Sequence, residues 1–93
     1  MENITQKKVN VWDTYVTKKD GAIMHFDILA PVDITDTNTI YDYGKEYLQT
    51  KGQEGQPLSS KQCQLCHIEE LQPEWEADIN TKGYFIIEME GCK

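Results

Sequence analysis

The sequence predicts an α+β fold, in which a β-hairpin opens a four-stranded sheet and two helices pack on that sheet. Three observations favour it: an Asp-Gly turn between two β-rich stretches, two segments with apolar residues at helical spacing, and an apolar stretch near the C-terminus. The expected order is strand, strand, helix, strand, helix, strand. Because 93 residues support a single modest core, we expect residues 1–6 to be a flexible tail and residues 7–93 to be one compact domain.

The first two strands are predicted on either side of the turn at Asp20-Gly21, which is the strongest short-range hairpin signal in the chain. Residues 8–17 alternate and are rich in Val, Trp, Thr and Tyr, which is typical of a strand. Residues 22–30 are predicted to form the second strand, which ends at Pro31 because proline cannot donate to a β-ladder.

The register expected for this hairpin places odd positions of the first strand beside even positions of the second. One face then carries Trp12 and Thr14 together with His25 and Asp27. A histidine close to a carboxylate is the beginning of an acid–base pair, but we favour a hydrogen-bonded polar patch beside Trp12. Large apolar side chains fall on both faces, which predicts a sheet covered on both sides or a dimer surface.

The first helix is predicted to begin at Asp36 or Thr37, either of which can cap it, and to end near Lys51, before Gly52. Its apolar stripe consists of Ile40, Tyr43 or Gly44, Tyr47 and Leu48. The polar stretch 52–60 that follows contains two glycines and is the longest expected loop.

Residues 61–70 allow two interpretations. Ser59 followed by Gln62 fits a capping box that opens a helix, whereas residues 62–68 also fit a short strand. We favour the strand because Pro73 begins another helix shortly afterwards.

The last two elements have clear ends. The second helix runs from Pro73 in its first turn to Lys82, with Trp75 directed inward and Gly83 as the C-terminal cap. Residues 84–90 form the last predicted strand.

Charge and composition exclude several classes of partner. Sixteen acidic residues stand against nine lysines, the formal net charge is −7, and the chain contains no arginine. Arginine is the preferred residue for bidentate contacts to phosphate and guanine, and a negative chain is repelled by nucleic acid and anionic lipid. We therefore expect no nucleic-acid partner and no membrane partner. Residues 1–8 are polar and carry no targeting segment, which predicts a cytoplasmic location.

The stretch Cys63-Gln64-Leu65-Cys66-His67 is the main candidate for chemistry. It matches the signature of haem attachment, which we set aside because that attachment takes place outside the cytoplasm. Zinc is the better candidate, since it takes four cysteine or histidine ligands. The expected ligands are Cys63, Cys66, His67 and Cys92, with His25 as an alternative fourth ligand.

Two other interpretations of the cysteines stay open. A thiol–disulfide oxidoreductase needs an acidified thiol, typically at a helix N-terminus, whereas a regular strand directs Cys63 and Cys66 to opposite faces. Plain packing is the interpretation we favour, because free cysteine behaves as a small buried hydrophobe. Zinc is thus the one cofactor retained as possible, and the sequence assigns no catalytic residue and no other cofactor-binding residue.

Several motifs spread over the chain are similar to those of one small family. They are Val11–Val16, Asp20-Gly21, Met24–Asp27, Cys63-x-x-Cys66-His67, Gly83–Ile86 and Met89–Cys92. In these motifs the chain, from about Lys8 to Cys92, resembles the uncharacterised bacterial family catalogued as domain of unknown function twenty twenty-four. The resemblance implies a compact α+β fold, a bacterial source and no established activity.

The function expected from the sequence is that of a small non-enzymatic binding or interaction domain whose ligand the sequence does not identify. A homodimer is the partner that the apolar side chains on both hairpin faces suggest. The alternatives are a zinc-binding domain and a thiol–disulfide oxidoreductase.

Overall fold

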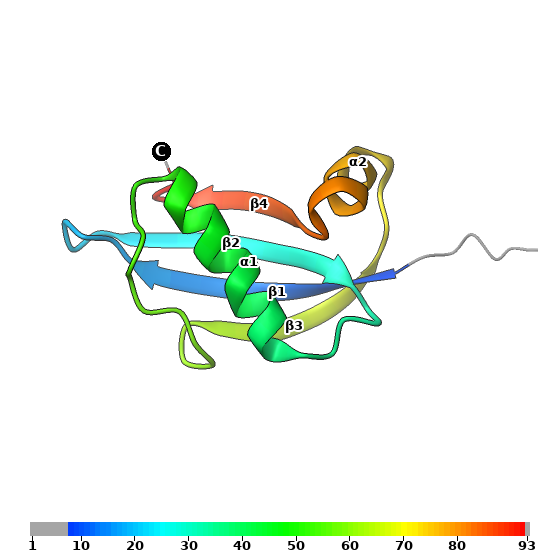
Figure 1. The fold of residues 1–93 in the computed structure, drawn as a ribbon, viewed down its shortest axis with the longest axis horizontal. Coiled ribbons are helices and arrows are strands. Elements are labelled where there is room, and N and C mark those ends of the chain that lie inside the picture. The colour runs from blue at the N-terminus through cyan, green and yellow to red at the C-terminus, as the bar shows by residue number, and fades with distance from the viewer. Residues whose placement is uncertain (1–7, 93) are drawn as a thin grey trace, which may run out of the picture.

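The computed structural model describes residues 8–92, so the predicted tail at residues 1–6 lies outside the described part of the chain. The strands are β1 (Lys8–Thr17), β2 (Ile23–Pro31), β3 (Cys63–Glu70) and β4 (Phe85–Glu90), and the helices are α1 (Thr37–Thr50) and α2 (Pro73–Lys82). The strands form one antiparallel sheet in the order β3-β1-β2-β4 (Figure 1). The predicted class and element order are therefore confirmed. Among residues 8–92, no helix is long and apolar enough to cross a bilayer.

The turn between β1 and β2 corrects the register expected from the sequence. The Lys18 N–H donates to the Ala22 oxygen at 2.7 Å and the Gly21 N–H donates to the Lys18 oxygen at 2.9 Å, while Gly21 has φ +93°. This is a three-residue hairpin loop, whose last residue must adopt the left-handed conformation. Its odd length pairs positions of the same parity, so the predicted odd-with-even faces were wrong.

The same-parity register changes which side chains share a face. Asp13 pairs with Asp27 and Tyr15 with His25 on one face of the sheet. Thr14 pairs with Phe26 on the other face. Thr14 is fully buried there, and its hydroxyl lies 3.3 Å from Cys63 Sγ. The predicted grouping of Thr14 with His25 and Asp27 is therefore replaced by a grouping with Asp13.

The two helices lie on opposite faces of the sheet. The core under α1 includes Trp12, Val16, Met24, Phe26, Ile28, Ala30, Ile40, Tyr47 and Leu48. The core under α2 consists of Val9, Val11, Leu29 and Ile79, with Leu71, Trp75, Phe85 and Ile87 packed at its margin. Figure 1 shows α1 lying across the sheet and α2 near one end of it. The sheet is thus covered on both faces, but unequally.

The short length of α2 accounts for the unequal cover of the two faces. The ten residues of α2 span about 15 Å, whereas a ten-residue strand such as β1 spans about 33 Å. One short helix therefore covers only part of its face. We call the uncovered part the open face, and it carries Asp13, Tyr15, His25 and Asp27.

The helix ends agree with the sequence signals. Asp36 caps α1, because its side chain accepts a hydrogen bond from the Asn38 N–H at 3.1 Å. Pro73 occupies the first turn of α2, and Gly83 ends that helix with φ +94°. The middle of α1 lies close to its neighbours, since a Cβ placed at Gly44 would lie 2.5 Å from Leu58 Cδ1.

Residues 63–70 form a strand with one irregularity. The Ser59 N–H does donate to Gln62 Oε1 at 2.9 Å, as in a capping box, but this interaction closes a single turn before β3 begins. Within β3, His67 pairs with Val11 and Leu65 pairs with Trp12. Cys66 is therefore the extra residue of a β-bulge, which locally reverses the alternation of faces.

Candidate functional site

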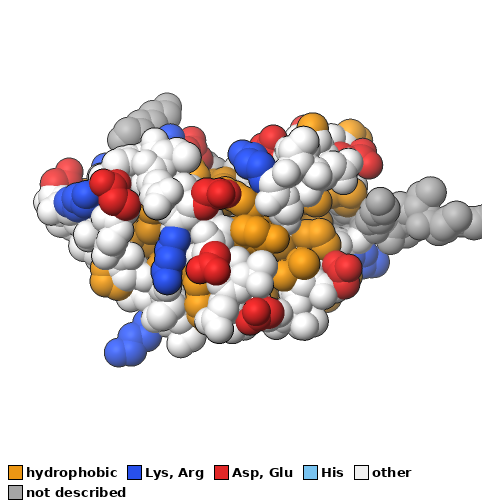
Figure 2. Space-filling model, viewed as in Figure 1, with side chains coloured by type: hydrophobic (Ala, Val, Ile, Leu, Met, Phe, Trp, Pro, Cys, Tyr) orange, Lys and Arg blue, Asp and Glu red, His pale blue; other side chains and the backbone are white. Residues whose placement is uncertain are grey.

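One groove of the molecule has a mainly apolar lining. It has a volume of about 670 Å³ and is lined by the start of β1, the end of β2 with the segment that follows it, and α2. Figure 2 shows exposed apolar side chains between α1 and α2 in this view. Its lining residues include Val9, Val32, Ile34, Leu71 and Ile79. Its titratable lining residues are Lys8 and Asp33, and neither belongs to a cluster of potential metal ligands among the described residues. The titratable side chains that lie close together are on the open face instead.

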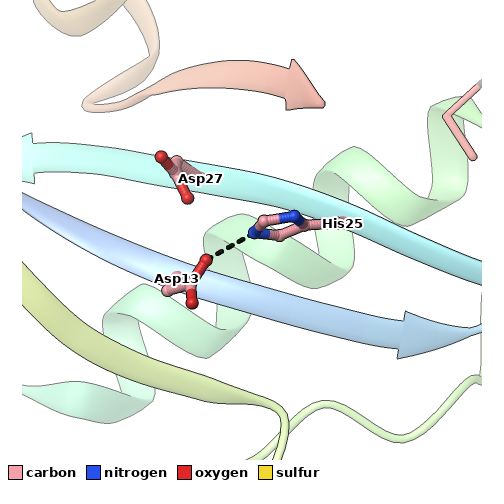
Figure 3. Close-up of side chains that lie close together, drawn as sticks. All are labelled: Asp13, His25 and Asp27. Atoms are coloured by element: carbon pink, nitrogen blue, oxygen red, sulfur yellow. Dashed lines mark hydrogen bonds and ion pairs between the residues drawn. The ribbon is translucent and has the colours of Figure 1, made fainter. Parts of the chain in front are cut away.

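Three titratable side chains meet on the open face. His25 Nε2 lies 2.6 Å from Asp13 Oδ1, and Asp27 lies directly opposite Asp13 on the neighbouring strand. One potential ligand atom from each residue lies within 4.8 Å of the others. Figure 3 shows the three side chains on the same side of the sheet, with α1 behind it. We call these residues the Asp–His–Asp cluster.

Asp27 is the most buried member of this cluster, with a relative exposure of 7%. Burial raises the pKa of its carboxyl group, and the charge of Asp13 and a hydrogen bond with Asp13 raise it further. His25 and His67 act in the opposite direction. The negative charge of Asp13 on the neighbouring strand opposes ionisation of Asp27, because like charges repel. A shared proton or a bound cation relieves that repulsion.

Tyr15 orients the imidazole of the cluster. Its ring stacks on the His25 ring with a centroid distance of 4.1 Å and an interplanar angle of 12°. The stacking fixes the plane of the His25 ring, and the hydrogen bond to Asp13 fixes its rotation within that plane. His25 therefore presents Nε2 to the two carboxyl groups in a defined direction.

A groove adjoins the cluster beneath α2. It has a volume of about 400 Å³, and Asp27 belongs both to its wall and to the cluster. The other lining residues are Val11, Leu29, His67, Glu69, Gln72, Glu74, Trp75 and Ile87. His67 is held at the rim by its contact with Glu69, where Nε2 and Oε2 are 2.8 Å apart.

The cysteines predicted to bind zinc are not brought together. Cys63 and Cys66 belong to β3, whereas Cys92 follows β4, and these strands are opposite edges of the sheet. Cys63 is buried under α1, where burial raises the pKa of its thiol, and Cys66 is exposed at the bulge. Cys92 is buried with the α1 core, and all three thiols are free.

The two histidines of the predicted zinc site also lie apart from those thiols. His67 lies at the rim of the groove, and His25, the alternative fourth ligand, belongs to the Asp–His–Asp cluster. Cys92 Sγ lies 3.5 Å from the backbone oxygen of His25, but the imidazole lies on the opposite face of the sheet. Asp13 is the member of the cluster that the sequence interpretation missed. The three-residue loop ending in Gly21 was the signal that could have found it.

Comparisons with known proteins give a family and a fold. The sequence model of the family described as "Domain of unknown function (DUF2024)" matches residues 7–89. The NMR structure of protein NE1680 from Nitrosomonas europaea is 40% identical in sequence, with a TM-score of 0.79. That similarity covers 92% of this chain and 99% of the other. No curated protein matches the chain.

Proposed function

Because this chain belongs to the DUF2024 family, whose description names no activity, we propose its function from the open face. The domain is a small binding protein that takes a divalent transition-metal cation at Asp13, His25 and Asp27. One observation carries this proposal: an imidazole nitrogen and two carboxylate oxygens lie within 4.8 Å of one another, and one of these carboxyl groups is almost fully buried.

The electrostatics of the cluster favour a cation. Asp27 has a carboxyl group as its hydrogen-bonding neighbour, so the pair carries either an extra proton or repulsive negative charge. A divalent cation would replace the proton and neutralise both carboxylates. Metal–ligand bonds of about 2.0–2.2 Å bring ligand atoms roughly 3–4 Å apart. The three atoms already approach that spacing.

The donor types select the class of cation. Imidazole suits zinc, copper, iron and nickel, whereas magnesium and calcium prefer oxygen ligands alone. A site with one nitrogen and two oxygen donors therefore favours a cation such as Zn²⁺ over Mg²⁺. Three protein ligands also leave at least one coordination position open to water or to another ligand.

Isothermal titration calorimetry on protein freed of metal by a chelator tests this function. We expect one Zn²⁺ site and, at equal concentrations, Mg²⁺ binding weaker by about a hundredfold or more. His25→Gln and Asp27→Asn each remove one ligand, so each should weaken Zn²⁺ binding by about tenfold or more. The matched controls Asp42→Asn and Cys66→Ser change exposed residues outside the cluster and should bind like wild type. Wild-type affinity in Asp27→Asn, or no binding by wild type, would reject the proposal.

The cellular setting and self-association are further proposals. Three free thiols suit a reducing compartment, which supports a cytoplasmic location. A homodimer formed along β3 is supported by its outer edge position and by Leu65 and Ile68, which are 52% and 57% exposed. Light scattering coupled to size exclusion at several concentrations tests this dimer, and a monomer throughout would contradict it.

A further inference from the structure

The groove beneath α2 is a second candidate site next to the Asp–His–Asp cluster. We propose that this groove binds a small organic amine, as a protonated ammonium group attached to an aromatic or branched apolar body. The ammonium group would contact Asp27, and the apolar body would lie against Trp75. This binding does not require a metal ion.

The size and floor of the groove fit a small molecule with an apolar body. Its volume of about 400 Å³ lies within the roughly 300–1,000 Å³ typical of small-ligand sites. Val11 and Leu29 form a buried apolar floor, and Ile87 and Trp75 stand beside it. The Trp75 ring is held by stacking on Phe85, with a centroid distance of 6.3 Å. A fixed indole face can contact both an apolar body and a neighbouring cation.

The charge of the lining selects a cation. Three carboxyl groups line the groove, from Asp27, Glu69 and Glu74, and no lysine is among its lining residues. The N-terminus of α2 also reaches the groove and by itself would favour an anion. Glu74 and Glu76 lie in the first turn of that helix and offset its positive end. An anionic ligand would therefore meet net repulsion.

Asp27 supplies an independent reason for an ammonium group. It is buried, it faces the groove, and within residues 8–92 its side chain lies opposite the Asp13 carboxyl group on the neighbouring strand. No nitrogen donor from that part of the chain reaches it, and in Figure 3 the hydrogen bond joins His25 to Asp13, not to Asp27. A protonated amine offers three donors and a positive charge. It would therefore satisfy the carboxylate that the protein leaves without a donor.

The test uses tryptamine, 2-phenylethylamine and isoamylamine as probes, with chelator present so that the result is independent of metal binding. Isothermal titration calorimetry compares tryptamine with two molecules of similar shape, the neutral tryptophol and the anionic indole-3-acetate. We expect tryptamine to bind about tenfold more tightly than tryptophol, because its ammonium group makes one charge-assisted contact that tryptophol lacks. Indole-3-acetate should bind more weakly than tryptophol, because its negative charge is repelled by the carboxyl groups. Nitrogen-15 NMR of the wild-type protein should show the largest shift changes at Val11, Leu29 and Ile87.

Two variants locate the amine. Asp27→Asn removes the charge with little change in shape and should weaken tryptamine binding by about tenfold, while Asp42→Asn should leave it unchanged. Trp75→Leu should reduce the preference for tryptamine over isoamylamine. Failure of all three amines to bind, equal affinity for tryptamine and indole-3-acetate, or shift changes centred away from the groove would each overturn the proposal. A negative result here leaves the zinc titration unaffected, so the two proposals fail separately.

Discussion

The two faces of the sheet use the same strands for different purposes. Under α1, the side chains of β1 and β2 are buried along most of their length, from Trp12 to Val16 and from Met24 to Ala30. On the other face, apolar residues stop where α2 stops covering them. Val9 and Val11 are buried, whereas the next two residues on that side, Asp13 and Tyr15, are polar and partly or largely exposed. The larger core thus lies on one face of the sheet, and the Asp–His–Asp cluster lies on the other.

The alternation of residues along β1 accounts for this difference between the two faces. Successive residues point to opposite faces. The even positions from Trp12 to Val16 are buried under α1, whereas the odd positions change from apolar Val9 and Val11 to polar Asp13. The change coincides with the end of the cover that a ten-residue helix can provide. A polar cluster at that place is therefore a specific feature of the sequence, not a gap in the core.

The largest expected effect comes from removing a large side chain under α1. Phe26 is fully buried, and its ring packs 4.7 Å from that of Tyr47. Phe26→Ala should lower the free energy of unfolding by about 3–5 kcal/mol, as measured by urea denaturation. Tyr15→Ala on the open face, where the side chain is 49% exposed, should cost less than about 1 kcal/mol. Equal losses would contradict the division between the faces. Ile28→Val, at about 0.5–1.5 kcal/mol, tests the same face if Phe26→Ala does not fold.

A matched pair of substitutions compares the two helices directly. Ile40 on α1 is fully buried and Ile79 on α2 is 9% exposed. Ile40→Ala should cost about 3–4 kcal/mol and Ile79→Ala about 2 kcal/mol, because the smaller core under α2 collapses more easily around a cavity. Thermal and urea unfolding of both variants would measure the difference. A larger loss for Ile79→Ala would mean that α2 carries more of the stability than its short contact suggests.

The signals that were local in sequence predicted the fold well. Asp20-Gly21, the Asp36 cap, Pro73 and Gly83 each indicated an element end that the structure bears out, and the resemblance to the family is confirmed. Such local signals did not predict the order of the strands in the sheet, because that order depends on contacts between residues far apart in the chain. The predicted zinc site relied on Cys92 lying beside β3, and the order β3-β1-β2-β4 separates them.

The prediction of the candidate site was wrong because the hairpin register was shifted by one residue. A loop with an even number of residues pairs odd with even positions, and the actual loop of three residues pairs like with like. Because a shift of one position moves every side chain to the other face, Thr14 was expected where Asp13 lies. His25 and Asp27 were recognised as a pair, but the second carboxyl group, Asp13, which completes the proposed cation site, was not.

A smaller effect of opposite sign is expected at the cluster. The folded protein raises the pKa of Asp27 above its ordinary value of 3.8. Folding therefore holds the proton more tightly, and the domain loses stability as pH rises from that value through the higher folded pKa. In the presence of chelator, Asp27→Asn should stabilise the domain by about 1 kcal/mol at neutral pH and by almost nothing at low pH. Urea unfolding across this pH range would measure it. Asp42→Asn, at an exposed position, should follow wild type at every pH.

The smallest expected effect concerns the exposed thiol. Cys66 is exposed at the bulge, whereas Cys63 and Cys92 are buried. Cys66→Ser should change the free energy of unfolding by less than about 0.5 kcal/mol. In native wild-type protein, one thiol should react quickly with an alkylating reagent and two slowly, as read by mass spectrometry. Two fast thiols would instead favour a reactive Cys63–Cys66 pair and revive the oxidoreductase interpretation.

The most direct test of the central claim is the absorption spectrum of the Co²⁺-loaded protein. Cobalt ligated by oxygen and nitrogen gives visible bands alone, while a thiolate ligand adds a charge-transfer band in the near ultraviolet. We predict visible bands without the thiolate band, the same spectrum in Cys66→Ser, and loss of the bands in His25→Gln and Asp27→Asn. A thiolate band that disappears in Cys66→Ser and persists in Asp27→Asn would contradict the account and place the metal at the cysteines.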